Sequence, residues 1–292
     1  LGLATEFPDD ALTVIVNTGD DLDLFGLHVS PDLDTVMYTL AGMANPETGW
    51  GLSGDTFQAL EMLARYGQPD WFRVGDRDLA THLMRTSLLR SGLSLTEVTE
   101  TLRKSLGVRP RIIPMCNESV RTWIRLDAGW LPFQEYFVLR GYADPPLEVE
   151  HRQVEAAAID DEVREAILSA GVIVVAPSNP VVSIGPILAI PGVQGLLKSA
   201  AASKVGVSPI VGGEAVSGPA AQLMRAVALE PSASGVAAAY ASFLDLLVVD
   251  SRDPDAVSQV EATGMRAAST DTLMPDLESK RRLARFVVEA VG

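Results

Sequence analysis

The stretch Leu12-Thr-Val-Ile-Val-Asn17-Thr-Gly-Asp20-Asp21-Leu-Asp23 decides the fold of this 292-residue chain. It begins as a continuous apolar run closed by turn residues, which is typical of a parallel strand buried on both faces. The acidic loop that follows leads into Ser30-Pro31, a helix start whose first turn carries Asp32 and Asp34. Carboxylates gathered at the end of a buried strand repel one another unless a hard cation or hydrogen-bond donors lie among them. The stretch therefore predicts an α/β fold with a magnesium site at the end of this strand.

The charge of the chain limits its partners. The net charge is −15, and residues 1–60 contain no lysine or arginine. Nucleic acids and anionic membrane surfaces both need a basic footprint, so neither is an expected partner. A single cysteine, Cys116, and the lack of an apolar run long enough to span a membrane predict a cytoplasmic protein.

The rest of the chain alternates apolar strands with helical patterns. This alternation predicts one Rossmann-like, doubly wound α/β domain over residues 1–292, with a mainly parallel sheet and helices on both faces. A helical and β-rich insert over about residues 42–152 is expected to form a cap, with a strand over Phe133–Leu139 among its elements. The other predicted strands lie near 172–176, 204–207, 245–250 and 265–268, and the predicted helices lie at 55–66, 76–91, 94–107 and 160–170.

The aspartates are the first candidates for chemistry. Asp20 and Asp21 are candidate catalytic residues, and Asp20, Asp32 and Asp34 are candidate ligands of Mg²⁺, which prefers carboxylate oxygens shared with substrate phosphates. Part of the set has a plainer interpretation. Asp32 beside Ser30-Pro31 would also complement a helix N-terminus, and Asp23 would also stay solvated.

Two polar loops that follow predicted strands are the second candidates. Ser178, Asn179, Ser183 and Gly185 follow the strand near 172–176, and Ser208 and Gly212 follow the next strand. Backbone N–H groups at such loops converge on phosphates, and adjacent parallel strands would place both loops around one nucleotide. Taken alone, the first loop is more often a simple turn, and a positive φ at Gly212 explains the second loop equally well.

Aromatic residues and missing motifs narrow the chemistry further. Trp71, Trp123, Trp130, Phe133 and Tyr136 are candidates for an aromatic bed under a planar ring, although core packing is the commoner use of such residues. The sequence lacks G-x-x-x-x-G-K-[ST] and G-x-S-x-G, and its one G-x-G-x-x-G, at Gly49-Trp-Gly51-Leu-Ser-Gly54, does not directly follow a predicted strand as a dinucleotide-binding turn would. Direct, metal-assisted transfer remains as the favoured reaction class.

Four segments together carry a resemblance to a known family. They are Asn-Thr-Gly-Asp-Asp at 17–21, Ser-Pro-Asp-Leu-Asp-Thr-Val-Met-Tyr at 30–38, Gly-Asp-Arg-Asp-Leu-Ala-Thr-His at 75–82, and Ala-Pro-Ser-Asn-Pro-Val-Val-Ser-Ile-Gly-Pro-Ile-Leu at 176–188. In this order they resemble the 2-phospho-L-lactate transferase family, which includes bacterial phosphoenolpyruvate transferases. The likeness extends over essentially the whole chain.

The resemblance implies a reaction. A phospholactyl or phosphoenolpyruvyl group would pass from a guanosine diphosphate-linked donor to the ribityl hydroxyl of 7,8-didemethyl-8-hydroxy-5-deazariboflavin, releasing GMP, in the biosynthesis of a redox deazaflavin coenzyme. Magnesium dependence and a homodimer would accompany it. Which acid the donor carries, lactate, enolpyruvate or glycerate, is left open.

The resemblance also implies roles for residues. Asp20 resembles the acceptor- and metal-contacting aspartate of the family, and the loop at Ser178-Asn179 resembles part of its guanine nucleotide site. Family members begin with a strand and a glycine-rich turn that would cradle phosphates, and this sequence begins after that point. The predicted acceptor site comprises Asp20, Asn17, Thr18, Asp55 and Gln58.

Two rival hypotheses remain. The superfamily also resembles sugar-nucleotide-binding regulators that bind a ligand without turnover, and another magnesium-dependent nucleotidyl or phosphoryl transferase would suit the same scaffold.

Overall fold

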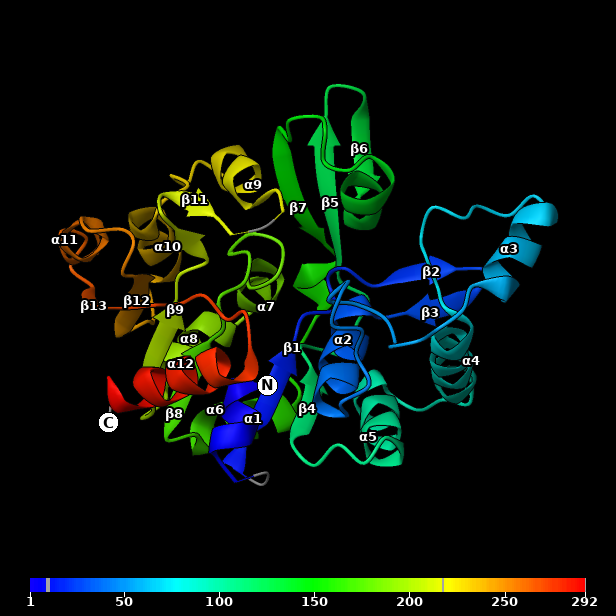
Figure 1. Cartoon of the computed structure of the whole chain (residues 1–292), viewed down its shortest axis with the longest axis horizontal. Helices are drawn as coiled ribbons and strands as arrows, with labels where there is room; N and C mark the ends of the chain where they lie inside the picture. The colour runs from blue at the N-terminus through cyan, green and yellow to red at the C-terminus, as the bar shows by residue number, and fades with distance from the viewer. Residues whose placement is uncertain (9–10, 217, 292) are drawn as a thin grey trace.

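A four-stranded parallel sheet lies at one end of the molecule in the computed structural model, which describes residues 1–8, 11–216 and 218–291 (Figure 1). All of its neighbouring strands run parallel, as the alternating pattern of the sequence predicts. In spatial order its strands are β13 (Arg266–Thr270), β12 (Leu246–Asp250), β9 (Ser203–Val207) and β8 (Val172–Val175).

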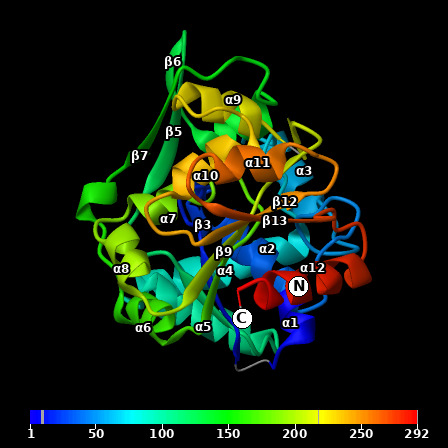
Figure 2. The same cartoon turned by 90° about the vertical axis from the view of Figure 1, so that its left-hand side faces the viewer.

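Helices cover both faces of this sheet, because successive side chains of a strand point to opposite faces. In β12, Leu246 and Val248 pack with Leu283 and Val287 of helix α12. Leu247 and Val249 belong instead to the large core formed with the helices of the other face. Figure 2 shows α12 on one side and α10 and α11 on the other. The doubly wound α/β architecture is confirmed.

The helices of the carboxyl-terminal half connect these strands. A short hairpin, β10 (Ile210–Val211) with β11 (Glu214–Ala215), follows β9. The helices are α6 (Asp161–Ser169), α7 (Gly185–Ala189), α8 (Val193–Ser199), α9 (Ala220–Ala226), α10 (Ala233–Tyr240), α11 (Ala256–Glu261) and α12 (Leu277–Glu289).

A second parallel pair carries the acidic loop. Strand β1 (Thr13–Val16) pairs with β4 (Arg111–Pro114), so the latter belongs to the parallel α/β layer although the sequence placed it in a β-rich excursion. Helices α2 (Pro31–Leu40) and α5 (Leu95–Ser105) pack on this pair through Leu33, Met37 and Leu102. Between β1 and α2 the chain forms the hairpin β2 (Leu22–Leu24) and β3 (Leu27–Val29).

Two helices of the predicted insert, α3 (Gln58–Arg65) and α4 (Asp76–Arg90), cap each other. The Asp76 carboxylate accepts from the backbone N–H of Gln58 and Ala59 at the start of α3. The Asp55 carboxylate accepts from the N–H of Arg77 and Asp78 at the start of α4. Each carboxylate therefore satisfies free donors of the other segment's helix.

The predicted insert also contains a three-stranded antiparallel sheet, which stands apart from the other layers in Figure 1. Its strands are β6 (Gly129–Pro132), β5 (Arg121–Leu126) and β7 (Glu148–Arg152). The strand predicted over Phe133–Leu139 is wrong, since Glu135–Leu139 forms a π-helix, η2. Phe133 and Tyr136 are both buried, and this spacing of three suits a helical turn rather than a strand.

Near the chain ends, α1 (Gly2–Glu6) packs on α12, with Glu6 paired to Arg281 and Arg285. Within the part of the chain that the structure describes, no helix is long and apolar enough to cross a membrane.

Candidate active site

A pocket of about 470 Å³ lies where several parallel strands end. Its walls come from the loop after β1, the loop after β8, the hairpin after β9 and the loop after β13. Its polar side is formed by Asp20, Asp32, Ser178, Asn179, Ser183 and Ser208, and its apolar side includes Phe133, Phe137, Val211, Ala215, Val216 and Met274. The acidic residues and the polar loops of the sequence therefore line one cavity.

Asn17 joins the acidic residues to the loop after β8. Its Nδ2 donates to Oδ2 of Asp32 (3.0 Å) and to the carbonyl of Val182 (3.3 Å), and its Oδ1 accepts from the N–H of Gly19 (2.8 Å). Asn17 is buried, so these bonds are protected from water. The side chain fixes the relative position of two loops that are distant in sequence.

Three buried oxygen atoms of the acidic loop have no hydrogen-bond partner: Thr18 Oγ1, Asp20 Oδ1 and Asp21 Oδ1. Burial raises the pKa of the Asp20 carboxyl well above its usual range, and the nearby charge of Asp32 raises it further. Burial also raises the pKa of Asp32 to about 6. Unpartnered oxygens in an acidic, buried loop are costly unless they coordinate a cation or bind a donor group.

Asp21 faces a different set of partners from Asp20 and does not line the pocket. Its Oδ2 accepts from Ser30 Oγ (2.8 Å) and lies 2.8 Å from His28 Nε2. Ser30 occupies the N-cap position of α2, as predicted, but its hydroxyl makes no capping bond to the helix. The hydroxyl serves Asp21 instead, which ties the acidic loop to the start of α2.

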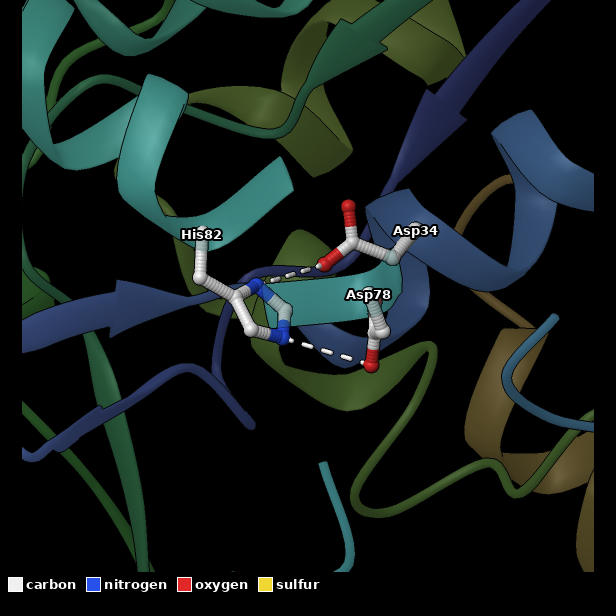
Figure 3. Close-up of side chains that lie close together, drawn as sticks. All are labelled: Asp34, Asp78 and His82. Carbon is white, nitrogen blue, oxygen red and sulfur yellow. Dashed lines mark ion pairs between the residues drawn. The ribbon is translucent and has the colours of Figure 1, made fainter. Parts of the chain in front are cut away.

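Asp34 lies in a buried ionic network between α2 and α4. Both of its oxygens bind the guanidinium of Arg85, one at 3.0 Å. His82 sits between two carboxylates, with Nδ1 3.6 Å from Asp34 Oδ2 and Nε2 3.3 Å from Asp78 Oδ2 (Figure 3). Tyr38 also donates to Asp78 (2.7 Å).

Asp34, Asp78 and His82 are close enough to one another to hold a metal ion. The guanidinium of Arg85 already neutralises Asp34, however, and a second cation beside it would be repelled. Asp34 does not line the pocket with Asp20 and Asp32. The metal role predicted for Asp34 stays a prediction, and its contacts favour a structural role.

The predicted nucleotide-binding residues divide into two groups. Ser178, Asn179, Ser183 and Ser208 line the pocket. Asn179 Oδ1 accepts from the N–H of Val181 (2.9 Å), and Ser208 Oγ accepts from the N–H of Ile210 (3.1 Å), so both also shape their own turns. Gly185 and Gly212 are not part of the lining.

Each of these two glycines has a local structural reason. A Cβ on Gly185 would lie 3.1 Å from the carbonyl oxygen of Pro180 and 3.2 Å from His151 Nε2. Gly212 has a φ of +62° in the turn between β10 and β11. A contact of Gly185 or Gly212 with a nucleotide stays a prediction.

The predicted acceptor residues also divide. Asp20 lines the pocket, and Asn17 and Thr18 are buried immediately beside it. Asp55 and Gln58 take part in the reciprocal caps of α3 and α4 and do not line the pocket. An acceptor role for these two residues stays a prediction.

Several pocket residues were missed by the sequence reasoning. Thr272, Leu273 and Met274 follow β13, so the rule that ligands bind beyond the carboxyl ends of parallel strands would have indicated them. Asp250 at the end of β12 accepts from both the N–H and the hydroxyl of Thr272 (2.8 Å each) and so holds that loop in place. Phe137 also lines the pocket, and the strand predicted over Phe133–Leu139 gave no indication of that position.

The charged side chains that line the pocket, among the residues that the structure describes, are all acidic. Among the described residues that line it there are two carboxylates and no lysine or arginine. The fold is that of a doubly wound α/β protein, and its pocket lies beyond the carboxyl ends of the strands, where proteins of this class bind their ligands.

Comparison with known proteins identifies the family of the chain. The family model described as 2-phospho-L-lactate transferase CofD matches residues 2–290. The chain is 45% identical over 294 residues to a phosphoenolpyruvate transferase of Streptomyces griseus subsp. griseus, covering 99% of this chain and 92% of the relative. It is 39% identical over 287 residues to a 2-phospho-L-lactate transferase of Methanococcoides burtonii, covering 98% and 93%.

A solved structure supports the fold alone. The crystal structure of a member of the UPF0052 family from Bacillus halodurans aligns with a TM-score of 0.64 at 17% identity, covering 98% of this chain and 93% of that one. From the family model and the relatives, the chain belongs to the 2-phospho-L-lactate transferase CofD family and is a transferase.

Proposed function

We propose that the protein transfers a phospholactyl or phosphoenolpyruvyl group from a guanosine diphosphate-linked donor to the ribityl hydroxyl of a deazariboflavin, releasing GMP. The names of the relatives support the transferred group. The observation that carries the proposal for this chain is the shared pocket, in which Asp20 and Asp32 lie with the loops after β8 and β9.

Two observations support magnesium binding in this pocket. Asp20 Oδ1 is buried without a partner, and the described lining offers no basic side chain to a phosphate. A diphosphate beside two carboxylates would be strongly repelled without a cation between them. We propose Asp20 and Asp32 as the residues that hold Mg²⁺, which when bound would neutralise charge on the phosphates.

The residues of the chain prepare both reactants. We propose that the Asp20 carboxylate, which is buried and lines the pocket, also accepts the proton of the attacking hydroxyl. Asn17 orients Asp32 by its hydrogen bond, and Asp21, held by His28 and Ser30, adds negative charge behind Asp20. We propose that the loops at Ser178-Asn179 and Ser208, which line the pocket after the neighbouring strands β8 and β9, contact the nucleotide.

Product analysis tests the proposal. The protein is incubated with 7,8-didemethyl-8-hydroxy-5-deazariboflavin, Mg²⁺ and, in separate reactions, guanosine diphosphate-linked phosphoenolpyruvate, phospholactate or phosphoglycerate. We expect mass spectrometry to show GMP and the acceptor enlarged by one phosphoacyl unit with at least one donor. Tight binding of donor with no product in any reaction would contradict the proposal and favour a non-catalytic regulator. The homodimer implied by the family resemblance stays a prediction.

A further inference from the structure

A backbone hydrogen bond joins the acidic loop to the antiparallel sheet of the insert. The N–H of Thr122, on β5, donates to the carbonyl of Gly19 (2.8 Å), one residue before Asp20. The two segments are in close contact, because a Cβ on Gly19 would lie 2.8 Å from Thr122 Oγ1 and 3.0 Å from Pro186 Cγ. Thr122 is buried. The sheet of the insert therefore supports the backbone of the acidic loop beside Asp20.

The side chain of Thr122 extends this connection to His151. The two residues are cross-strand partners on β5 and β7, and Thr122 Oγ1 lies 3.3 Å from His151 Nδ1. The other ring nitrogen, Nε2, lies against the loop after β8, since a Cβ on Gly185 would be 3.2 Å from it. The imidazole also forms a hydrogen bond with the backbone of Val181 in that loop. His151 therefore joins the insert to the loop after β8.

The protonation state of His151 gives these hydrogen bonds a direction. Burial lowers the pKa of His151 to about 4, although its hydrogen bond with Val181 acts in the opposite sense. A bond that favours the protonated ring is one in which the ring donates, so the acceptor is the Val181 carbonyl. The imidazole is neutral at pH 7, and its second nitrogen is then an acceptor. The hydroxyl of Thr122 donates to Nδ1, and the imidazole donates to Val181.

Val181 belongs to the turn that carries pocket residues. Its N–H and that of Val182 both donate to Asn179 Oδ1, at 2.9 Å and 3.3 Å. Asn179 and Val182 line the pocket. The carbonyl of Val182 accepts from Asn17, which comes from the acidic loop. Two consecutive carbonyls of this turn are therefore held by side chains from two different parts of the fold, Val181 by His151 and Val182 by Asn17.

We propose that His151 is a positioning residue that, through Thr122 and the Val181 carbonyl, sets the spacing between the acidic loop and the loop after β8. His151 does not itself line the pocket. The inference rests on the proposed function, because the reaction that depends on this spacing comes from it. Groups held by two loops react only while the loops keep their relative position, and a displacement of about 1 Å costs on the order of 10²-fold in rate.

The test compares variants of the full chain in the presence of Mg²⁺. His151→Phe keeps a ring and removes both nitrogens, whereas His151→Gln keeps an N–H donor on a side chain of similar reach. Thr122→Val removes the hydroxyl, and Thr122→Ser keeps it. Glu150→Gln is the matched control, because Glu150 is an exposed residue of the same strand and points to the opposite face. Circular dichroism and Tm establish that each variant is folded.

We expect His151→Phe to lower kcat on the order of tenfold, with the GDP affinity measured by calorimetry and the KM for acceptor within about twofold of wild type. His151→Gln and Thr122→Ser should recover most of the turnover, and Glu150→Gln should match wild type. Thr122→Val should lower kcat, but the double variant His151→Phe/Thr122→Val should be no slower than His151→Phe, because both residues act through one path.

Three kinetic results would overturn the inference. They are an unchanged kcat in His151→Phe, losses of GDP affinity as large as the loss of kcat, and losses that multiply in the double variant. The second result would show that His151 only maintains the nucleotide site, and the third would show that the two residues act independently.

Amide hydrogen exchange followed by mass spectrometry tests the same inference without turnover. We expect His151→Phe to exchange faster than wild type in peptides that cover residues 17–21 and 178–185, and Glu150→Gln to exchange as wild type does. Unchanged exchange of both peptides in His151→Phe would overturn the inference. Absence of product from wild type with all three donors would reject the proposed function instead, and hydrogen exchange would still decide the role of His151.

Discussion

At the scale of single residues, burial separates aspartates that look alike in sequence. Asp20 is buried with an unpartnered oxygen in the pocket, Asp21 is held by His28 and Ser30, and Asp34 is neutralised by Arg85. Asp23 is exposed on β2. The sequence predicted that this loop is functional because it follows a buried strand. It could not distinguish their surroundings, since Arg85, the side chain that neutralises Asp34, lies 51 residues away along the chain.

Asp20→Asn tests the role of the most buried pocket carboxylate. We expect loss of transfer by at least about 10²-fold in kcat, because both the proton acceptor and a metal ligand are removed. Steady-state kinetics with a folded protein measures the effect. Asp23→Asn is the matched control and should retain wild-type turnover. Near-normal turnover of Asp20→Asn would reject the assignment.

Arg85→Met tests the structural interpretation of Asp34. Removal of the guanidinium leaves Asp34 buried without its partner, and we expect the free energy of unfolding to fall by about 3–5 kcal/mol. The double variant Asp34→Asn/Arg85→Met should lose less than the single one, because it removes both charges. Chemical denaturation provides the measurement. Equal losses in the two variants would show that the ion pair is not what stabilises this region.

At the scale of elements, a capping signal predicts a helix start correctly when both hydrogen-bonding residues lie within a few positions of each other in the sequence. The capping box at Ser94 and Glu97 predicts the start of α5, and both of its hydrogen bonds are present. The strand predicted over Phe133–Leu139 is wrong, although the aromatic and aliphatic residues of this segment favour a strand by composition. Phe133 and Tyr136 instead pack together into the core, and Glu135–Leu139 forms a π-helix.

The reciprocal caps of α3 and α4 give a prediction at this scale. A Cβ on Gly75 would lie 2.2 Å from Asp55 Oδ2, so Gly75→Ala must displace the carboxylate that caps α4. We expect a loss of about 1–2 kcal/mol in the free energy of unfolding. Gly171→Ala is the control, because nothing lies within 4 Å of the added carbon there. A loss no greater than that of the control would show that the cap contributes little.

At the scale of the whole molecule, hydrophobic periodicity predicted the architecture well. The strands near 172, 204, 245 and 265 all belong to one parallel sheet. The apolar runs of β8 and β12 mark them clearly in the sequence, whereas β13 contains Arg266, Ser269 and Thr270. The periodicity could not predict that the insert's π-helix and the loop after β13 meet in the same pocket. That meeting depends on tertiary packing between distant segments.

The acidic pocket makes the stability of the cation-free molecule depend on pH. Burial raises the pKa of Asp32 to about 6, whereas in the unfolded chain it is about 3.9. The folded state therefore binds more protons between these values, and stability falls as pH rises from about 4 to about 6. In EDTA we expect Tm to drop by roughly 2–6 °C more across this range in wild type than in Asp32→Asn.

As a control for this pH effect, the Tm of wild type and of Asp32→Asn is also measured with Mg²⁺ present. Saturating Mg²⁺ should raise the Tm of wild type at pH 7 and leave that of Asp32→Asn nearly unchanged. Parallel pH profiles of the two proteins in EDTA would show that Asp32 does not carry the effect.

Titration with a metal ion measures whether Asp20 and Asp32 hold a divalent cation in the pocket. Mn²⁺, which is paramagnetic and also prefers oxygen ligands, is titrated into wild type, Asp20→Asn and Asp23→Asn in the presence of GDP, with free Mn²⁺ measured by electron paramagnetic resonance. We expect one tightly bound ion per chain in wild type and in Asp23→Asn, and its loss in Asp20→Asn. Equal Mn²⁺ binding by Asp20→Asn and wild type would contradict this expectation.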